Sequence, residues 1–445
     1  MKKLMMIAVA FSALAASAEI SITDVTARQR WPWNGLVDID FTISGAAAGE
    51  AFAIDIDATA SSGATQLSAR TYTTEPVAGA GANRIVWDLG ADYPNFRAND
   101  VRISVTATPI SSDTPIYMVI DLSGGATATK YPVRYTTQAP AHVQGAANEP
   151  CQTTELWMKR INPVSVAFRV NNWATPAADN GAYFGKVTKS YYIGVFELTQ
   201  KQYNLITGEW PSFYSNQTCR ASRPLEYVPY KTFTGTGDDC DASPSSITAS
   251  SPLGKLRAKT GLPLNLPTDI QWEYACRGGT KLNSGGEFYR YYVNGSQAAN
   301  NSISRYSGNV ASGPTGDSDT TYATATVGSY LPNGYGLYDM IGNVRECLSA
   351  YGIASGNSYR NHYQESSGDN TLGMSMDNPI VDPHGTPLSL AQGSNSIYRR
   401  ARGGSFSTSG NPGIWTAENW ESSISYAGAQ SQSRQTGYRL SMPVE

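Results

Sequence analysis

Apolar and polar residues alternate in four short runs along the first hundred residues of the chain, at positions 37–43, 52–56, 85–89 and 101–105. Alternation with a period of two is typical of strands that bury one face. Turns rich in Gly, Ala and Asn separate the runs. The pattern predicts an N-terminal all-β sandwich, Ig-like in its short strands and turn spacing, over residues 19–110.

This first domain carries no recognisable catalytic constellation. We therefore expect a spacer or an adhesion module. The alternative is a glycan-binding face that uses one of its tryptophans, Trp31, Trp33 or Trp87.

A polar stretch at residues 111–115 predicts a linker, and the second domain is expected over residues 115–445. Two segments there carry the signal of a helix start, because a Thr is followed three residues later by a Gln that can complete a capping box. A Gly follows each segment and provides a helix stop. These signals lie at Thr199, Gln202 and Gly208, and at Thr268, Gln271 and Gly278. They predict two short helices in an α+β domain made otherwise of strands and long loops.

The N-terminus has the pattern of a secretory signal peptide over residues 1–18. Lys2 and Lys3 precede an apolar run at 4–14, and the motif Ala-Ser-Ala at 16–18 resembles a cleavage site. No later segment approaches the roughly 18 unbroken apolar residues that cross a bilayer. We expect an exported protein, periplasmic or extracellular, with no membrane span after cleavage.

Composition agrees with a loop-rich exported protein. Of the 445 residues only 16% are charged, against about 25% in average proteins. The net charge of -3 does not indicate the excess of basic residues that is typical of nucleic-acid-binding proteins. Five cysteines in an exported chain predict disulfides with at least one thiol left over. Cys219 and Cys240 bracket a loop and are the predicted bridge, whereas Cys276 is expected to be a buried, inert thiol within a helix.

Residues 333–346, Asn-Gly-Tyr-Gly-Leu-Tyr-Asp-Met-Ile-Gly-Asn-Val-Arg-Glu, combine turn residues with oxygen ligands. This segment resembles the signature of the formylglycine-generating, sulfatase-modifying factor family, whose catalytic domain has a C-type-lectin-like fold. Four further segments are similar to family motifs in the same order, at 191–203, 262–279, 402–406 and 437–440. Apart from the signature these segments are interpreted as fold markers. We expect Trp272 and Tyr203 in the core, and Glu273 and Arg277 as an ion pair on a helix surface.

The resemblance implies structural calcium in two places. The first site would use the side chains of Asp339 and Glu346 with the carbonyls of Gly342 and Val344. Calcium prefers six to eight oxygen ligands of this kind. The alternative is that Asp339 and Asn343 are turn formers and Glu346 a solvated charge.

The second implied calcium site depends on a gapped alignment. It maps onto Asn300 with the carbonyl of Asn301, and onto Asp319 with the carbonyl of Thr321. Either ion would tie down loops in which regular hydrogen bonding is sparse.

Formylglycine-generating enzymes bind copper through two cysteines shortly after the 402–406 segment. Thr408 and Gly413 occupy those positions here, and no cysteine follows Cys347. A hydroxyl or a hydrogen cannot replace a soft thiolate, so copper is not expected. The three histidines, His142, His362 and His384, lie far apart in sequence and are expected to be ordinary loop residues.

These observations favour an exported, calcium-stabilised binding or scaffolding module that recognises a glycan or a protein and lacks oxidase activity. Residues 415–435, rich in Trp, Tyr, Ser, Asn and Gln, are a candidate recognition surface. The alternative is a divergent oxidoreductase of the same family that acts on protein cysteine and recruits a metal through Cys347 or the histidines. A structural component of the cell surface would look the same at this level.

Overall fold

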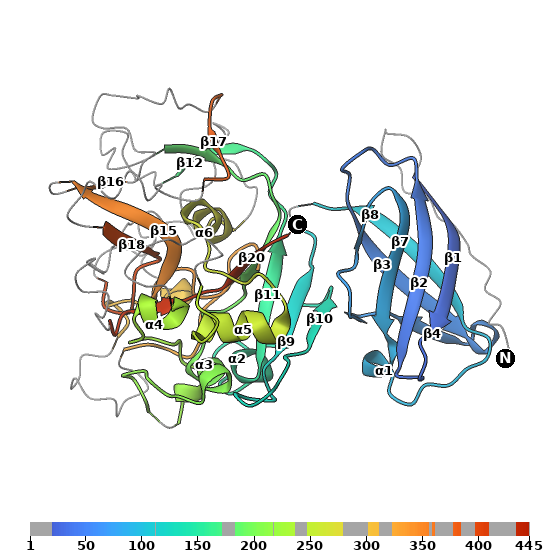
Figure 1. Ribbon diagram of the computed structural model, residues 1–445, viewed down its shortest axis with the longest axis horizontal. Coiled ribbons are helices and arrows are strands. Elements are labelled where there is room, and N and C mark those ends of the chain that lie inside the picture. The colour runs from blue at the N-terminus through green and yellow to red at the C-terminus, as the bar shows by residue number, and fades with distance from the viewer. Residues whose placement is uncertain are drawn as a thin grey trace. The chain divides into compact units, whose positions relative to one another are not determined.

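The computed structural model describes residues 20–111, 113–170, 183–216, 218–235, 247–278, 301–310, 323–355, 358–360, 377–383, 397–408 and 433–444. The chain forms two compact units, of which the first is Met1–Val119 with Val133–Ala139 and the second is Ile120–Pro132 with Pro140–Glu445. Figure 1 shows the elements of both units. The first passage between units lies close to the predicted linker, but the return at residues 133–139 has no signal in the hydrophobic pattern. The predicted signal peptide lies outside the described residues.

Two sheets form the first unit. One holds β1, β2, β7, β5 and β10, hydrogen-bonded in that order, and in the other β3 pairs with β4, β6 and β8. Their bounds are β1 Ser21–Gln29, β2 Leu36–Ser44, β3 Phe52–Ala60, β4 Thr65–Ser68, β5 Thr71–Tyr72, β6 Val77–Ala78, β7 Gly81–Asp88, β8 Arg102–Pro109 and β10 Val133–Thr136. Two short helical turns complete it, η1 at Ser61–Gly63 and α1 at Leu89–Asp92.

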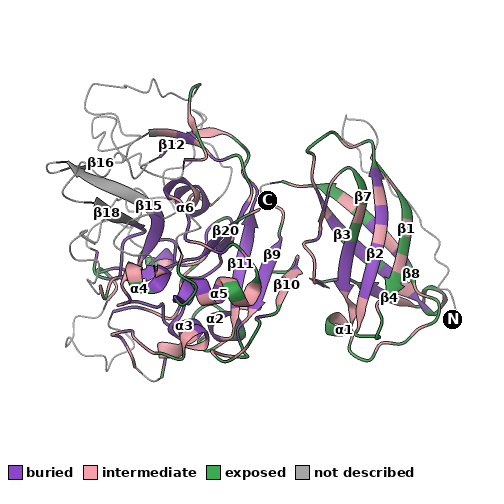
Figure 2. Ribbon diagram, viewed as in Figure 1, coloured by how far each residue is buried: buried purple, intermediate pink, exposed green. Residues whose placement is uncertain are grey.

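The core of the first unit is shared by both sheets. Ile39 of β2, Ile54 of β3, Ile85 of β7 and Ile103 of β8 are all buried in one apolar cluster. Figure 2 shows the same burial along β2 and β3. The four alternating runs are therefore strands or begin within one residue of a strand, and the first unit is built of strands around an apolar core. The Ig-like sandwich stays a prediction.

The tryptophans of this unit differ in exposure. Trp31 is 77% exposed and Trp33 is 62% exposed, with their rings edge to face at 5.4 Å. Trp87 is only 1% exposed, and its indole Nε1 donates to Asp92 at 2.7 Å. The prediction that Trp87 could belong to a glycan-binding face is wrong, because its ring faces the core between the sheets.

The second unit is built from short strands and long loops. In one sheet β14 pairs antiparallel with β11 and β20. A second joins β12, β13 and β17, and a third joins β16, β15 and β18 with β19 beside β15. The bounds are β11 Glu155–Ile161, β12 Ala167–Val170, β13 Tyr183–Lys186, β14 Tyr191–Gly194, β15 Arg345–Ser355, β16 Ser358–Arg360, β17 Ile380–Val381, β18 Ile397–Arg402, β19 Thr436–Tyr438 and β20 Ser441–Pro443. Strand β9, Tyr117–Asp121, spans the first passage between units.

Helices of the second unit are short. They are α2 Pro150–Thr153, η2 Arg220–Ser222, α3 Gln200–Thr207, α4 Tyr230–Thr234, α5 Pro252–Thr260 and α6 Asp269–Cys276. Both predicted capping boxes are confirmed, at the starts of α3 and α6. Gly208 ends α3 in the left-handed region at φ 89°. Helix α5 was not predicted, although Ser251 and Pro252 begin it and Gly261 ends it in the usual way.

The predicted core residues of the second unit are buried. Trp272 is fully buried, Tyr203 is 1% exposed, and Cys276 is fully buried with its Sγ 3.8 Å from the Met340 carbonyl. Burial raises the pKa of Cys276, as expected for an inert thiol. The predicted disulfide partner Cys240 lies outside the described residues, so that bridge stays a prediction.

The ion pair between Glu273 and Arg277 exists, but its predicted surface location is wrong. Both side chains are buried, at 0% and 7% exposure. Arg402 of β18 reaches the same place and binds Asp269 at 2.7 Å and Glu273 at 3.1 Å. A helix-surface pattern cannot reveal a partner that arrives from a strand 129 residues later.

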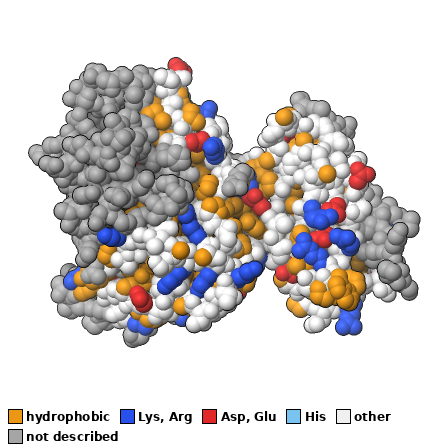
Figure 3. All heavy atoms as spheres, viewed as in Figure 1, with side chains coloured by type: hydrophobic (Ala, Val, Ile, Leu, Met, Phe, Trp, Pro, Cys, Tyr) orange, Lys and Arg blue, Asp and Glu red, His pale blue; other side chains and the backbone are white. Residues whose placement is uncertain are grey.

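Figure 3 shows Lys and Arg side chains spread over the visible face of each unit. They do not gather into one basic patch on that face. Among the described residues, no helix combines the length and the apolar character needed to cross a membrane.

The two capping threonines provide a matched test of this fold. We expect Thr268→Ala to lower the free energy of unfolding by about 1 kcal/mol, the usual value for an N-cap. Thr199→Ala should cost roughly 1–3 kcal/mol more, since Thr199 Oγ1 also donates to the buried Gln152 carbonyl at 2.8 Å and its loss leaves that acceptor unpaired. Denaturant unfolding of both variants measures the difference, and equal losses would contradict the assigned role of the second bond.

Candidate functional site

The signature segment 333–346 is a chain of tight turns anchored to helix α6. Asn333 Oδ1 accepts the N–H groups of Tyr335 at 3.0 Å and Leu337 at 3.1 Å, while its Nδ2 donates to the Ala275 carbonyl at 2.7 Å. Asp339 and Asn343 both adopt positive φ, 55° and 56°, which Asp and Asn tolerate better than most residues. Their predicted role as turn formers is therefore confirmed for the backbone.

Gly342 allows the closest approach in this segment. Its φ is +80°, and a Cβ at that position would lie 2.2 Å from the carbonyl oxygen of Arg305. No other residue type fits there without moving the Arg305 backbone.

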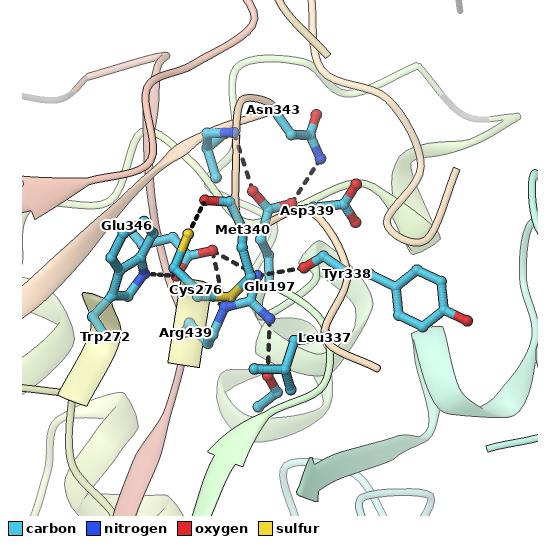
Figure 4. Close-up of polar contacts among 12 residues, drawn as sticks. Glu197, Trp272, Cys276, Leu337, Tyr338, Asp339, Met340, Asn343, Glu346 and Arg439 are labelled. Atoms are coloured by element: carbon cyan, nitrogen blue, oxygen red, sulfur yellow. Dashed lines mark hydrogen bonds and ion pairs between the residues drawn. The ribbon is translucent and has the colours of Figure 1, made fainter. Parts of the chain in front are cut away.

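Glu346 is fully buried and not solvated as one alternative required. Its carboxylate accepts from Arg439 Nε at 2.8 and 2.9 Å and from Nη2 at 2.6 Å, and from Trp272 Nε1 at 2.5 Å. Arg439 also donates to the carbonyls of Gly194 at 2.8 Å and Tyr338 at 2.7 Å. One guanidinium thus joins strand β14, the signature turns and strand β15 (Figure 4).

Glu197 is a second buried carboxyl group in the cluster. It accepts from Asn343 Nδ2 at 2.6 Å and from the Val344 N–H at 3.1 Å. Burial, with the charges of Asp339 and Glu346 added, raises the pKa of Glu197 well above its ordinary value.

Asp339 is the third buried carboxyl group in the cluster. Its Oδ2 accepts the Gly328 N–H at 2.6 Å, whereas its buried Oδ1 has no hydrogen-bond partner within the described residues. Burial raises the pKa of Asp339 to about 6, although the Gly328 N–H and Arg439 act in the opposite direction. A buried carboxylate oxygen without a hydrogen-bond partner destabilises the fold unless it binds a cation or a proton.

The four groups are unbalanced in charge. Three carboxyl groups, Glu197, Asp339 and Glu346, share one guanidinium, Arg439, which gives a net charge of -2 when all are ionised. The buried cluster at helix α6 differs, since its two carboxylates, Asp269 and Glu273, are matched by two arginines, Arg277 and Arg402. Figure 4 shows the three carboxyl side chains together with Arg439.

The donor set at Asp339 fits a hard cation such as calcium in part. The unpartnered Oδ1, the excess of negative charge and the tight turns that contain Gly342 and Val344 all suit one. Glu346 suits it less well, because both of its oxygens are already held by Arg439 and Trp272.

The second predicted calcium site lies mostly outside the described residues, which do not include Asn300, Asp319 or Thr321. Asn301 is described, and its Oδ1 accepts the Tyr306 hydroxyl at 2.9 Å. That site therefore stays a prediction.

The residue at the first position that the resemblance assigns to a copper ligand does not suit copper. Thr408 is buried, and its Oγ1 accepts the Ser405 N–H at 2.9 Å. A hydroxyl held in this turn is not a soft ligand. Gly413 lies outside the described residues, as do His362, His384 and most of the candidate surface 415–435.

Comparison with known proteins agrees with this geometry. Residues 185–441 match the family model of the sulfatase-modifying factor enzyme 1-like domain. That match covers more than half of the chain and contains Glu197, the signature and Arg439. The chain belongs to the sulfatase-modifying factor family. Its second unit, rich in strands with few short helices, agrees with the C-type-lectin-like fold expected of that family.

Curated relatives match this chain over limited spans. Mouse formylglycine-generating enzyme is 37% identical over 93 residues, 19% of this chain and 21% of that protein. The Streptomyces coelicolor formylglycine-generating enzyme is 32% identical over 141 residues, 32% of this chain and 35% of that protein. Chaperone protein LppX of Paenibacillus barcinonensis is 29% identical over 182 residues, 35% of this chain and 60% of that protein. The chain thus spans about a fifth of the mouse relative's length.

Two solved structures are similar over a longer span. Treponema denticola variable protein 1 covers 69% of this chain and 100% of its own length, with 19% identity and a TM-score of 0.45. PvdO from Pseudomonas aeruginosa covers 68% of this chain and 100% of its own length, with 18% identity and a TM-score of 0.38. Both scores lie below 0.5, and the family assignment rests on the sequence match.

Two central residues of this buried cluster, Glu197 and Arg439, lie in segments that were interpreted from sequence as fold markers. A local signal existed for both, because each is a charged residue inside an apolar segment, Ile193–Leu198 and Tyr438–Leu440. Such a residue is buried only with a partner.

Loss of Arg439 should show how unbalanced the cluster is. We expect Arg439→Met to lower the free energy of unfolding by about 3–5 kcal/mol, because it leaves buried carboxylates without their cation. In the wild type, burial already raises the pKa of Glu197 and Asp339, and loss of Arg439 should raise the pKa of these groups further. The native state then binds more protons than the unfolded chain, so the free energy of unfolding of the variant should fall more steeply than that of the wild type as pH rises from 5 to 8.

The double variant Glu346→Gln with Arg439→Met is the control, since it removes one negative and one positive charge together. It should recover part of the lost stability. Thermal unfolding at several pH values measures both effects, and a flat pH response of Arg439→Met would contradict the charge assignment.

Proposed function

We propose that this member of the sulfatase-modifying factor family is an exported, calcium-stabilised binding or scaffolding module for a glycan or protein ligand, without the ability to oxidise cysteine to formylglycine. The observation that carries the proposal is the position and the hydrogen bond of Thr408. The residue stands where the resemblance assigns a copper-binding cysteine, and its hydroxyl is committed to Ser405.

The described cysteines offer no evident replacement for the missing ligand. Cys151, Cys219, Cys276 and Cys347 are all buried. Burial raises the pKa of the Cys276 thiol well above its usual range, and a protonated thiol is a poor copper ligand or nucleophile. Oxidation of a substrate cysteine would need a metal held in another way.

Calcium is proposed at Asp339, through its unpartnered Oδ1, with the carbonyls of Gly342 and Val344, and with Glu346 shared with Arg439. The ion would supply the positive charge that the cluster lacks and would hold the signature turns together. No catalytic step is assigned to it.

Export and ligand binding rest on the sequence pattern. The predicted signal peptide at 1–18 supports export, and the composition of residues 415–435 supports a recognition surface. A sandwich in front of a loop-rich domain suits a stalk that presents such a surface.

The first experiment is mass spectrometry of a sulfatase-type cysteine peptide after incubation with the purified mature protein, copper, oxygen and a thiol reductant. We expect the mass of the peptide to stay unchanged, because Thr408 cannot bind copper. An active formylglycine-generating enzyme serves as the control. Conversion to formylglycine would overturn the proposal and support the divergent oxidoreductase, and Cys347→Ser would then test that thiol as a ligand.

Calcium binding has its own test in thermal unfolding with and without the ion. We expect calcium to stabilise the wild-type protein, by about 2.7 kcal/mol at a hundred times the dissociation constant. Asp339→Asn should abolish the shift. Asp269→Asn, a buried aspartate in the balanced cluster, should keep it even if the variant is less stable overall. An unchanged shift in Asp339→Asn, or none in the wild type, argues against calcium at this site.

A further inference from the structure

Three side chains of different chemistry converge near the start of helix α2. The ligand atoms of His142, Glu149 and Cys151 all lie within 4.8 Å of one another, and no other trio of His, Cys, Asp or Glu does so in the part of the chain that the structure describes. His142 Nδ1 is in hydrogen-bond contact with Glu149 Oε2. Cys151 Sγ lies 3.9 Å from the same oxygen and 4.0 Å from the Ala141 carbonyl.

The orientation of the His142 ring is set from its far side. Nε2 lies 2.9 Å from the Gly328 carbonyl oxygen, which can only accept, so Nε2 carries a hydrogen. Nδ1 is then the atom left to face Glu149 and Cys151. A histidine that ligates a metal through one nitrogen usually donates its other N–H to a carbonyl or carboxylate in this way.

Packing holds the ring in place. The His142 side chain is 1% exposed and meets the rings of Phe196 at 5.2 Å and Tyr338 at 5.0 Å. A Cβ on Gly328 would lie 2.4 Å from Nε2, so only glycine permits this approach. His142 lies in a loop, as expected, but its side chain is buried and its ring orientation is fixed by these contacts.

Glu149 and Cys151 are held by the backbone of α2. Glu149 is the N-cap residue, and its backbone N–H donates to Gln152 Oε1 at 3.1 Å. Its Oε1 accepts the Val143 N–H at 3.1 Å, which leaves Oε2 for His142 and Cys151. The Glu149 side chain remains 18% exposed, so solvent can reach one side of the cluster.

We propose that His142 Nδ1, Glu149 Oε2 and Cys151 Sγ form a zinc site, with the fourth position open to water. Imidazole, carboxylate and thiolate are the three ligand types that proteins use for zinc, and three protein ligands with one open position is a recurrent arrangement. For tetrahedral zinc, Nδ1 and Oε2 would separate to about 3.3 Å.

The proton balance favours a divalent ion. Without metal, the hydrogen bond between Nδ1 and Oε2 contains one proton, and the Cys151 thiol donates a second one toward Oε2. Zinc binding would expel both protons and form Zn–N, Zn–O and Zn–S bonds with a neutral imidazole, a carboxylate and a thiolate. Two charges enter and two leave, so the buried cluster keeps its net charge.

The test is the metal content of the full-length protein after incubation with zinc and removal of excess ion. We expect about one zinc ion per chain. Cys151→Ser and Glu149→Gln should each weaken zinc binding more than roughly 100-fold, since loss of an outer-shell partner alone costs 10- to 100-fold. Cys276→Ser, which removes another buried thiol outside the cluster, should keep wild-type affinity.

Cobalt substitution gives a second, spectroscopic measurement. A thiolate-to-cobalt charge-transfer band is expected, and its loss in Cys151→Ser but not in Cys276→Ser would assign the sulfur. Failure of the wild-type protein to retain zinc, bound cobalt without that band, or equal zinc affinity in Cys151→Ser and Cys276→Ser would each overturn the proposal.

Discussion

The second unit depends on one buried cation. Arg439 is fully buried, and it contacts Glu346 together with the carbonyls of Gly194 and Tyr338. Strands in this unit are short and its loops long, so few regular backbone ladders cross it. A guanidinium with five donors in a fixed fork is well suited to join such segments, because it can satisfy a carboxylate and two carbonyls at once. The residues that contact Arg439 come from two separate parts of the chain, strand β14 and the signature segment 333–346.

The same cluster is not optimised for stability. Three carboxyl groups around one guanidinium leave an excess of negative charge, and burial keeps the pKa of both Glu197 and Asp339 raised. A purely structural cluster would be expected to resemble the one around Arg402, where charges match. An imbalance next to an unpartnered carboxylate oxygen is the physical reason for proposing a cation there and not simply a salt bridge.

Sequence patterns predicted the features that depend on neighbours along the chain. The four alternating runs became strands and the two capping boxes became helix starts, because each signal acts within a few residues. The burial of the Glu273 and Arg277 pair, and the roles of Glu197 and Arg439, were missed. Asn343 lies 146 residues from Glu197, and Glu346 lies 93 residues from Arg439, so no local period could connect them. Only their placement in apolar segments indicated that partners exist.

The two proposed metal sites meet at one residue. The Gly328 N–H donates to Asp339, and the Gly328 carbonyl accepts from His142. Any displacement of the Gly328 backbone would therefore disturb both sites, and a substitution at Gly328 could not distinguish them. Asp339 and Cys151 each belong to one site only, which is why calcium and zinc binding can be separated by changing those two residues. If the sites influence each other, the effect must be reciprocal, since a coupling free energy between two bound ions is the same from either side.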